Sequence, residues 1–154
     1  MKRHLRWYRV ALDAAGAGDI RCRFSPGGRN EQTCDKSRVA AGGASCGVTQ
    51  SSNLATRRHD IKALMLLSGT ASEAAKAYVA ATPALAVFGA ASEGDPGAAK
   101  GIKEAVGASK NPQSTLKIYM GSEHGVPMFP KNPELEPMIV SWMKARLLGH
   151  GATH

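Results

Sequence analysis

Two short, almost uninterrupted apolar runs limit what this chain can fold into. Residues 61–67 read Ile-Lys-Ala-Leu-Met-Leu-Leu, and residues 85–89 read Leu-Ala-Val-Phe-Gly. Runs of this length, bounded by turn residues, are typical of strands that are covered on both faces, as in parallel sheets. We expect a third strand at residues 38–42. A fourth, at residues 114–120, alternates apolar and polar residues and therefore belongs nearer a sheet edge.

Helical segments separate these strands. Residues 45–58 and 96–108 fit helices, and a C-terminal helix has a 3.6-residue apolar period over Leu135, Met138, Ile139, Trp142 and Ala145. Either Asn132-Pro133 or Glu136-Pro137 is expected to start this last helix. Strand and helix alternate about four times, which predicts an α/β fold of about four parallel strands with helices on both faces.

The chain divides into three parts by pattern. Residues 36–149 carry the strand and helix alternation and form the predicted α/β core. Residues 1–35 begin with helical spacing at Leu5 and Leu12, but several glycines and Pro26 interrupt it. We expect an irregular or helical N-terminal segment there, and a short tail at residues 150–154.

Composition and charge narrow the function classes. The 154 residues are 43% hydrophobic and 21% charged, which is typical of a globular protein. The net charge of +8 leaves open a basic protein that binds anionic surfaces. We do not expect nucleic-acid binding, because the basic residues form no dense run with interleaved aromatic side chains. No apolar stretch is long enough to span a membrane.

The cysteines argue against a disulfide framework and a structural zinc site. Cys22, Cys34 and Cys46 are odd in number and show no Cys-x-x-Cys spacing. Asp13 interrupts the only apolar residues after the basic N-terminus, so we see no signal peptide. We therefore expect a cytoplasmic protein without a metal.

A Gly-x-Ser-x-Gly motif follows the first predicted strand. Residues 43–47 read Gly-Ala-Ser-Cys-Gly and directly precede a predicted helix. This is the strand–turn–helix context of a nucleophile elbow, in which a tight turn exposes the serine hydroxyl. The motif makes Ser45 a candidate nucleophile. The backbone N–H of Cys46, at the helix start, is a candidate oxyanion donor.

A carboxylate and a histidine follow in the order that an elbow serine requires. Asp95 comes after the strand at 85–89, and His124 comes after the strand at 114–120. The carboxyl ends of parallel strands share one edge of the sheet, so these side chains are expected close to Ser45. We predict a Ser45–Asp95–His124 triad, with Glu93 as the alternative acid. Asp95 also fits a helix N-cap before Pro96.

These motifs give the chain a resemblance to a known superfamily. Residues 35–148 resemble the C-terminal half of an α/β hydrolase, most closely the dienelactone-hydrolase-like branch. The motif residues that carry this likeness are Asp35 to Val39, Gly43 to Gly47, Leu66 to Gly69, Ser122 to Gly125 and Trp142. The resemblance implies that Ser45 is the nucleophile, Asp95 the acid and His124 the base. It implies a serine esterase that hydrolyses small carboxylic esters, with short acyl chains favoured, and needs no cofactor.

The resemblance also implies elements that residues 1–34 do not display. The family carries several more strands before the elbow and a loop that donates a second oxyanion N–H, for which residues 23–28 are the nearest match. We expect a truncated or minimal hydrolase, or one that a second chain completes. The open strand at residues 38–42 predicts self-association, with residues 1–35 or a second protomer covering that edge. Two alternatives remain: a non-catalytic hydrolase remnant that acts as an interaction domain, and a basic anionic-surface binder.

Overall fold

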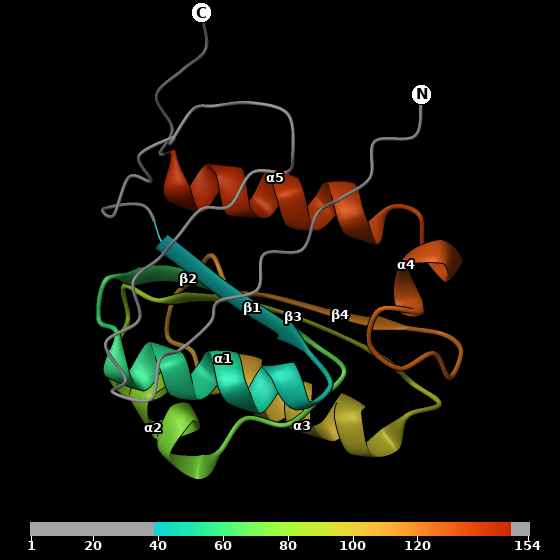
Figure 1. The fold of residues 1–154 in the computed structure, drawn as a ribbon, viewed down its shortest axis with the longest axis horizontal. Coiled ribbons are helices and arrows are strands. Elements are labelled where there is room, and N and C mark those ends of the chain that lie inside the picture. Colours follow the sequence, from blue (N-terminus) through green and yellow to red (C-terminus); the bar gives the residue numbers. More distant parts are fainter. Residues whose placement is uncertain (1–38, 149–154) are drawn as a thin grey trace, which may run out of the picture. The chain divides into compact units, whose positions relative to one another are not determined.

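The computed structural model of the protein describes residues 39–148. Figure 1 labels the elements, which are β1 (Val39–Ala44), α1 (Cys46–Arg57), β2 (Ile61–Leu67), α2 (Glu73–Ala81), β3 (Ala86–Ser92), α3 (Pro96–Gly107), β4 (Thr115–Tyr119), α4 (Met128–Lys131) and α5 (Leu135–Leu147). The N-terminal segment 1–35, the domain boundary at residue 36 and the tail 150–154, which the sequence predicts, lie outside the described residues.

The four strands form one parallel sheet in the order β1-β2-β3-β4. The expected α/β fold, with four parallel strands alternating with helices, is therefore confirmed. β4 lies at one edge of the described sheet, as its alternating residues predicted, and β1 lies at the other. All of β3 and nearly all of β2 are buried, whereas every residue of β1 is at least partly exposed.

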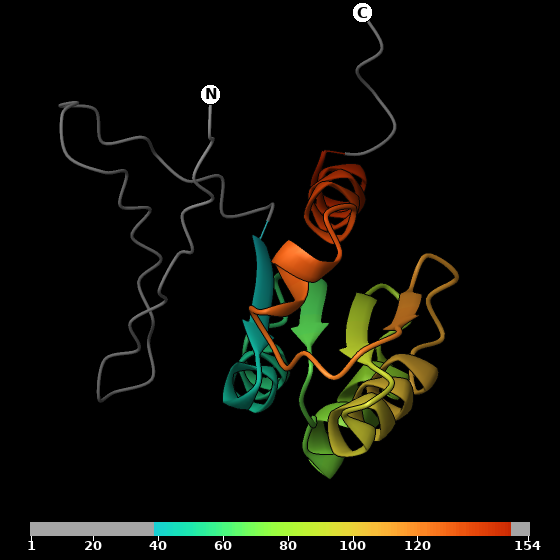
Figure 2. The ribbon, with the colours of Figure 1, turned by 90° about the vertical axis from the view of Figure 1, so that its right-hand side faces the viewer.

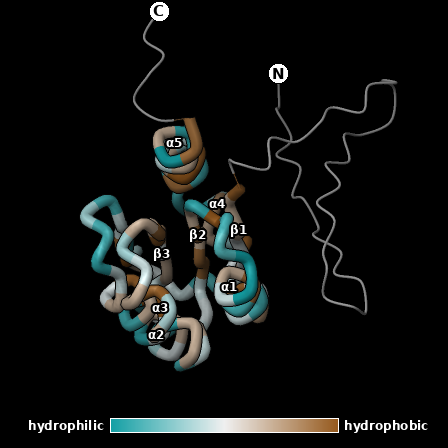
Figure 3. Tube along the Cα trace, turned by 90° about the vertical axis from the view of Figure 1, so that its left-hand side faces the viewer, coloured by the Kyte–Doolittle hydropathy of each residue, from teal (hydrophilic) through white to brown (hydrophobic). Residues whose placement is uncertain are grey.

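Helices cover both faces of the sheet, as Figure 2 shows. On one face, α1, α2 and α3 pack over a buried cluster that includes Leu66 and Val87. On the other face, α4 and α5 cover Leu67 and Phe88. Each fully buried side chain of this kind stabilises the fold by about 1.5–3 kcal/mol. Figure 3 shows β2 in hydrophobic colours between the two helical layers and α1 in mixed colours.

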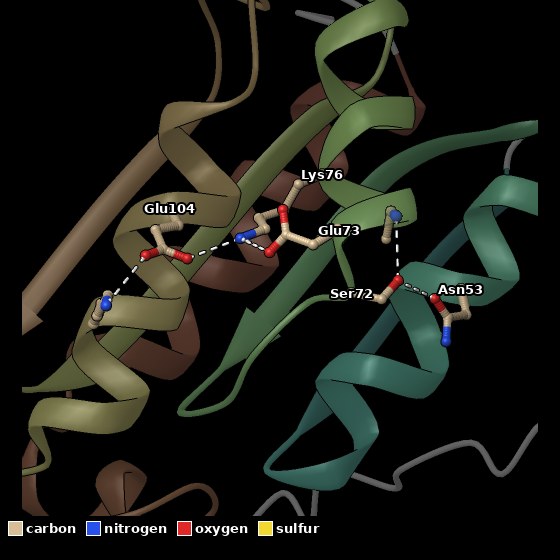
Figure 4. Close-up of polar contacts among 7 residues, drawn as sticks. Asn53, Ser72, Glu73, Lys76 and Glu104 are labelled. Carbon is tan, nitrogen blue, oxygen red and sulfur yellow. Dashed lines mark hydrogen bonds and ion pairs between the residues drawn. The ribbon is translucent and has the colours of Figure 1, made fainter.

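Polar contacts join the three helices of the first face, as Figure 4 shows. The Lys76 ammonium of α2 lies 2.6 Å from the Glu73 carboxylate and 2.8 Å from that of Glu104 on α3. The Ser72 hydroxyl, at the start of α2, donates to the Asn53 side-chain oxygen of α1 at 2.6 Å. These contacts link α2 to both neighbours.

The helices at the C-terminal end differ from the sequence prediction in two ways. The C-terminal helix α5 begins at Leu135, between the two proline pairs that were expected to start it. Pro137 is thereby in the first helical turn, where a missing N–H removes no intrahelical bond. The short helix α4 was not predicted, because a four-residue segment shows no period. Its Met128 is fully buried beneath α5.

Candidate active site

Three loops meet at the carboxyl ends of the strands. Ser45 follows β1, Asp95 follows β3 and His124 follows β4, so all three lie at one edge of the sheet. In Figure 1 the β1 arrowhead, the loop after β4 and α4 lie at the same, right-hand end of the sheet. Parallel strands place ligand and catalytic groups at this edge because their loops converge there.

Ser45 adopts a strained backbone conformation between β1 and α1. Its φ is 57° and its ψ is −122°, a region that non-glycine residues rarely enter. Such a conformation costs about 1–3 kcal/mol and persists only where neighbouring structure enforces it. The Ser45 N–H donates to the Leu67 carbonyl at 2.9 Å. A Cβ at Gly43 would lie only 2.1 Å from the Gly47 carbonyl oxygen, so the turn requires glycine there.

The Ser45 hydroxyl does not cap its own helix. Ser45 is the N-cap residue of α1, yet its side chain makes no capping bond. Ser72, the N-cap of α2, uses its hydroxyl in the ordinary way and accepts from the Ala75 N–H at 3.2 Å. The Ser45 Oγ instead lies 2.8 Å from His124 Nε2. The backbone turn therefore directs this hydroxyl to an imidazole.

Asp95 binds the other nitrogen of the same imidazole. Its Oδ2 is hydrogen-bonded to His124 Nδ1, while its Oδ1 accepts from the Ala98 N–H at 3.3 Å and caps α3. The bond with His124, and then the Ala98 N–H, lower the pKa of Asp95 against the opposing effect of burial. Asp95 is thus both a helix cap and an imidazole partner. The N-cap role and the contact with His124, which the sequence suggested as alternatives, are compatible.

The ionised Asp95 determines the histidine tautomer. A carboxylate only accepts hydrogen bonds, so Nδ1 of a neutral His124 must carry the proton. Nε2 is then an acceptor and faces the Ser45 hydroxyl. The order hydroxyl–imidazole–carboxylate is that of a nucleophile with its general base and the group that orients the base.

Glu93 lies apart from this chain of hydrogen bonds. It is exposed, and its backbone N–H donates to the Tyr119 carbonyl at 2.7 Å. It lines a surface concavity of about 360 Å³ over α3, with Pro96, Ala99, Lys100, Lys103 and Glu104. The structure brings Asp95, and not the alternative acid Glu93, to His124.

Cys46 begins α1 next to the candidate nucleophile. Its backbone N–H is at the helix N-terminus, where donors lack intrahelical partners and the helix dipole is positive. Its thiol is exposed. The position suits an oxyanion donor beside Ser45. The other candidate oxyanion segment, residues 23–28, lies outside the described residues.

The sequence did not indicate the residues that connect the loop carrying Asp95 to the loop carrying His124. Ser92 is fully buried, and its hydroxyl donates to the Glu123 carbonyl at 2.6 Å. A Cβ at Gly94 would lie 2.6 Å from the Gly121 carbonyl oxygen, so the two loops touch through their backbones. A polar residue that ends an otherwise apolar strand is the only signal that the sequence offers for Ser92.

Residues 39–148 contain neither a metal-binding cluster nor a membrane-spanning helix. Across this part of the chain, no three His, Cys, Asp or Glu residues are grouped so that they could hold a metal ion. None of its helices has the length and apolar character needed to cross a membrane.

Comparison with known proteins returns no match. No family model fits the chain, and neither a curated protein nor a solved structure is significantly similar to it. What can be said of function therefore rests on the residues at this edge of the sheet.

Proposed function

We propose that this protein is a serine hydrolase that cleaves carboxylic esters. One observation carries the proposal: a continuous hydrogen-bonded chain from the Ser45 hydroxyl through His124 to Asp95. The three residues come from three different loops. In the sequence, His124 is 29 positions from Asp95 and 79 positions from Ser45. The strained turn that presents Ser45 gives independent support, because such strain gathers at functional sites.

The reaction begins with proton transfer from Ser45 to His124. Nε2 takes the hydroxyl proton as Oγ attacks the ester carbonyl carbon, and the carbonyl π electrons move to oxygen. Collapse of this tetrahedral adduct expels the alcohol, which receives the proton from His124 and leaves an acyl-serine. Water, deprotonated by His124, then attacks the acyl carbon; the bond to Ser45 Oγ breaks, the acid is released, and His124 returns the proton to Oγ. Asp95 orients the imidazole and stabilises its cationic form.

Cys46 contributes through its backbone rather than its thiol. Its N–H, at the first position of α1, is the donor assigned to the developing oxyanion. A single backbone donor of this type contributes about 10²–10³-fold to kcat. No cofactor enters the proposed chemistry, because Ser45 and water act as the nucleophiles, His124 transfers the protons and Asp95 orients the base.

The substrate class follows from how open the site is. Ser45 is exposed, and 48% of the His124 side-chain surface is accessible. The concavity over α3 includes neither residue. A nucleophile that is this open to solvent favours esters with short acyl chains. The cysteine spacing favours a reducing compartment, and we propose the cytoplasm.

A short-chain ester assay tests the proposal. The wild-type chain should hydrolyse p-nitrophenyl acetate or butyrate, and Ser45→Ala should lower kcat by at least ~10³-fold. Hydrolysis should also depend on pH, because only the neutral imidazole of His124 can act as a base. A pH-independent rate would contradict a histidine base.

The same assay separates the alternatives. If wild type and Ser45→Ala are equally inactive while both are folded, the proposed ester hydrolysis fails and the alternative of a non-catalytic interaction domain gains support. If binding to anionic vesicles is strong and weakens steeply with salt, the basic-surface alternative gains support.

A further inference from the structure

Ser92 contacts both loops that carry the acid and the base. It is the last residue of β3 and is fully buried. Its carbonyl accepts from the Asp95 N–H at 3.1 Å, which shapes the turn that presents the carboxylate. Its hydroxyl donates at 2.6 Å to the carbonyl of Glu123, the residue immediately before His124. One side chain and one carbonyl thus link the two halves of the acid–base pair.

This hydroxyl completes a short series of bonds between the loops. The Glu93 N–H donates to the Tyr119 carbonyl and the Gly94 N–H to the Gly121 carbonyl, each at 2.7 Å. With Ser92, three consecutive residues bind every second carbonyl of the segment leading to His124. The bond nearest the histidine is the only one of the three that a side chain makes.

We propose that Ser92 is a positioning residue that holds the His124 imidazole between Ser45 and Asp95, an inference that rests on the proposed hydrolase function. Without the hydroxyl, the partly buried Glu123 carbonyl loses this donor and the backbone before His124 is released on one side. The imidazole must reach two partners at once, so a small displacement disturbs at least one of the two bonds. A misplacement of about 1 Å can reduce a rate by ~10²-fold.

Ser68 provides a matched control. It follows β2 at the same edge of the sheet, is also fully buried, and its hydroxyl donates to the Met128 sulfur at 2.9 Å. This bond reaches the α4 layer and touches neither Asp95 nor His124. Ser68→Ala therefore removes a buried hydroxyl without loosening the acid–base pair.

The experiment compares Ser92→Ala with Ser68→Ala in the full chain. We expect Ser92→Ala to lower kcat for p-nitrophenyl butyrate at least ~10-fold with KM within about twofold, because proton transfer is affected and ground-state binding is not. Ser68→Ala should keep kcat within about twofold. In proton NMR, the His124 Nδ1–H resonance should be present in wild type and Ser68→Ala, and lost or broadened in Ser92→Ala.

If Ser92→Ala does not fold, a second pair of variants tests the same role. Ser92→Thr and Ser92→Val have the same shape and differ by the hydroxyl, so the threonine variant should be at least ~10-fold more active. Equal kcat in this pair, or unchanged kcat and an unchanged Nδ1–H resonance in Ser92→Ala, would overturn the positioning role. If wild type hydrolyses no ester, the proposed function fails, and the resonance alone still decides whether Ser92 holds His124.

Discussion

The nucleophile and the acid–base pair are built on very different parts of the sheet. Ser45 follows β1, an edge strand in which every residue is at least partly exposed. Asp95 follows β3, an inner strand that is buried along its whole length. His124 follows β4, whose loop is bonded to the β3 loop at three carbonyls.

The difference shows two ways of placing a reactive group. The acid–base pair is held by hydrogen bonds between two loops, so its geometry depends on particular donors. Ser45 is held by a sterically tight turn, in which Gly43 approaches Gly47 and the backbone carries strain. We therefore expect substitutions in the two regions to have different effects. Changes near Asp95 should reduce activity in a folded protein, and changes near Gly43 should reduce folding itself.

Asp95→Asn should have the largest effect on activity. The amide can still cap α3, but it no longer fixes the protonated Nδ1 of His124 or stabilises the imidazolium. We expect kcat to fall by ~10³–10⁴-fold, with little loss of secondary structure. Steady-state kinetics with circular dichroism measure both.

Glu93→Gln is the matched control for that variant. Glu93 is two residues from Asp95, is exposed, and contacts the β4 loop only through its backbone N–H. Its kcat should remain within about threefold of wild type. A damaging Glu93→Gln beside a mild Asp95→Asn would transfer the acid role to Glu93.

Gly43→Ala should destabilise the elbow. The new Cβ would overlap backbone atoms of Gly47, which cannot move without displacing the start of α1. We expect a loss of at least ~2 kcal/mol in the free energy of unfolding, seen as a lower urea midpoint. A Cβ at Gly47 would have no atom within 4 Å, so Gly47→Ala should have a urea midpoint close to that of wild type. Equal midpoints for the two variants would contradict the tight-turn account.

Acid should remove the stabilising contribution of Asp95. The bond with His124 lowers the pKa of Asp95, so the folded state favours its ionised form. Stability from this group is present above the unfolded pKa of about 4 and is lost as the pH falls through the lower, folded value. Thermal unfolding from neutral to acidic pH should therefore show wild type losing more stability than Asp95→Asn. Parallel curves would mean that Asp95 is not paired.

The two sheet edges should also differ, with a smaller effect. β1 reads Val-Ala-Ala-Gly-Gly-Ala without a charge, whereas β4 carries Lys117. A charged side chain on an edge strand discourages pairing with another chain. We expect the wild-type chain to self-associate at micromolar concentration through β1, as sedimentation velocity would show.

Ala40→Lys should reduce that association. Ala40 belongs to neither buried cluster, so a lysine there adds charge to the edge without entering the core. Lys117→Glu keeps a charge on the opposite edge and should leave the sedimentation coefficient unchanged. Association that survives Ala40→Lys would exclude β1 as the contact.

Complete burial made β2 readable from the sequence, whereas β3, which is also buried throughout, continues three residues beyond the predicted run at 85–89. The run at residues 61–67 coincides with β2, because a strand covered on both faces needs apolar residues throughout. β1 is two residues longer than the predicted strand at its C-terminal end, since its glycines resemble a turn. α4 is too short to show a period, and tertiary burial of Met128 fixes it.

The candidate site was predictable only in part. Motif and chain order indicated Ser45, Asp95 and His124, because parallel strands bring their carboxyl ends to one edge. The choice between Asp95 and Glu93 depends on the path of one turn, which spacing does not reveal. The role of Ser92 depends on a contact with Glu123, 31 positions away, and no local sequence pattern indicates such a contact.

Labelling with a serine-directed phosphonate tests the central claim most directly. The account predicts one phosphonyl group per chain, attached to Ser45 in peptide mass mapping, with ester hydrolysis lost in proportion to labelling. Ser45→Ala should take up no label, and Asp95→Asn should take it up more slowly than wild type. Labelling of Cys46, with Ser45→Ala still active, would contradict the account and assign the chemistry to the neighbouring thiol.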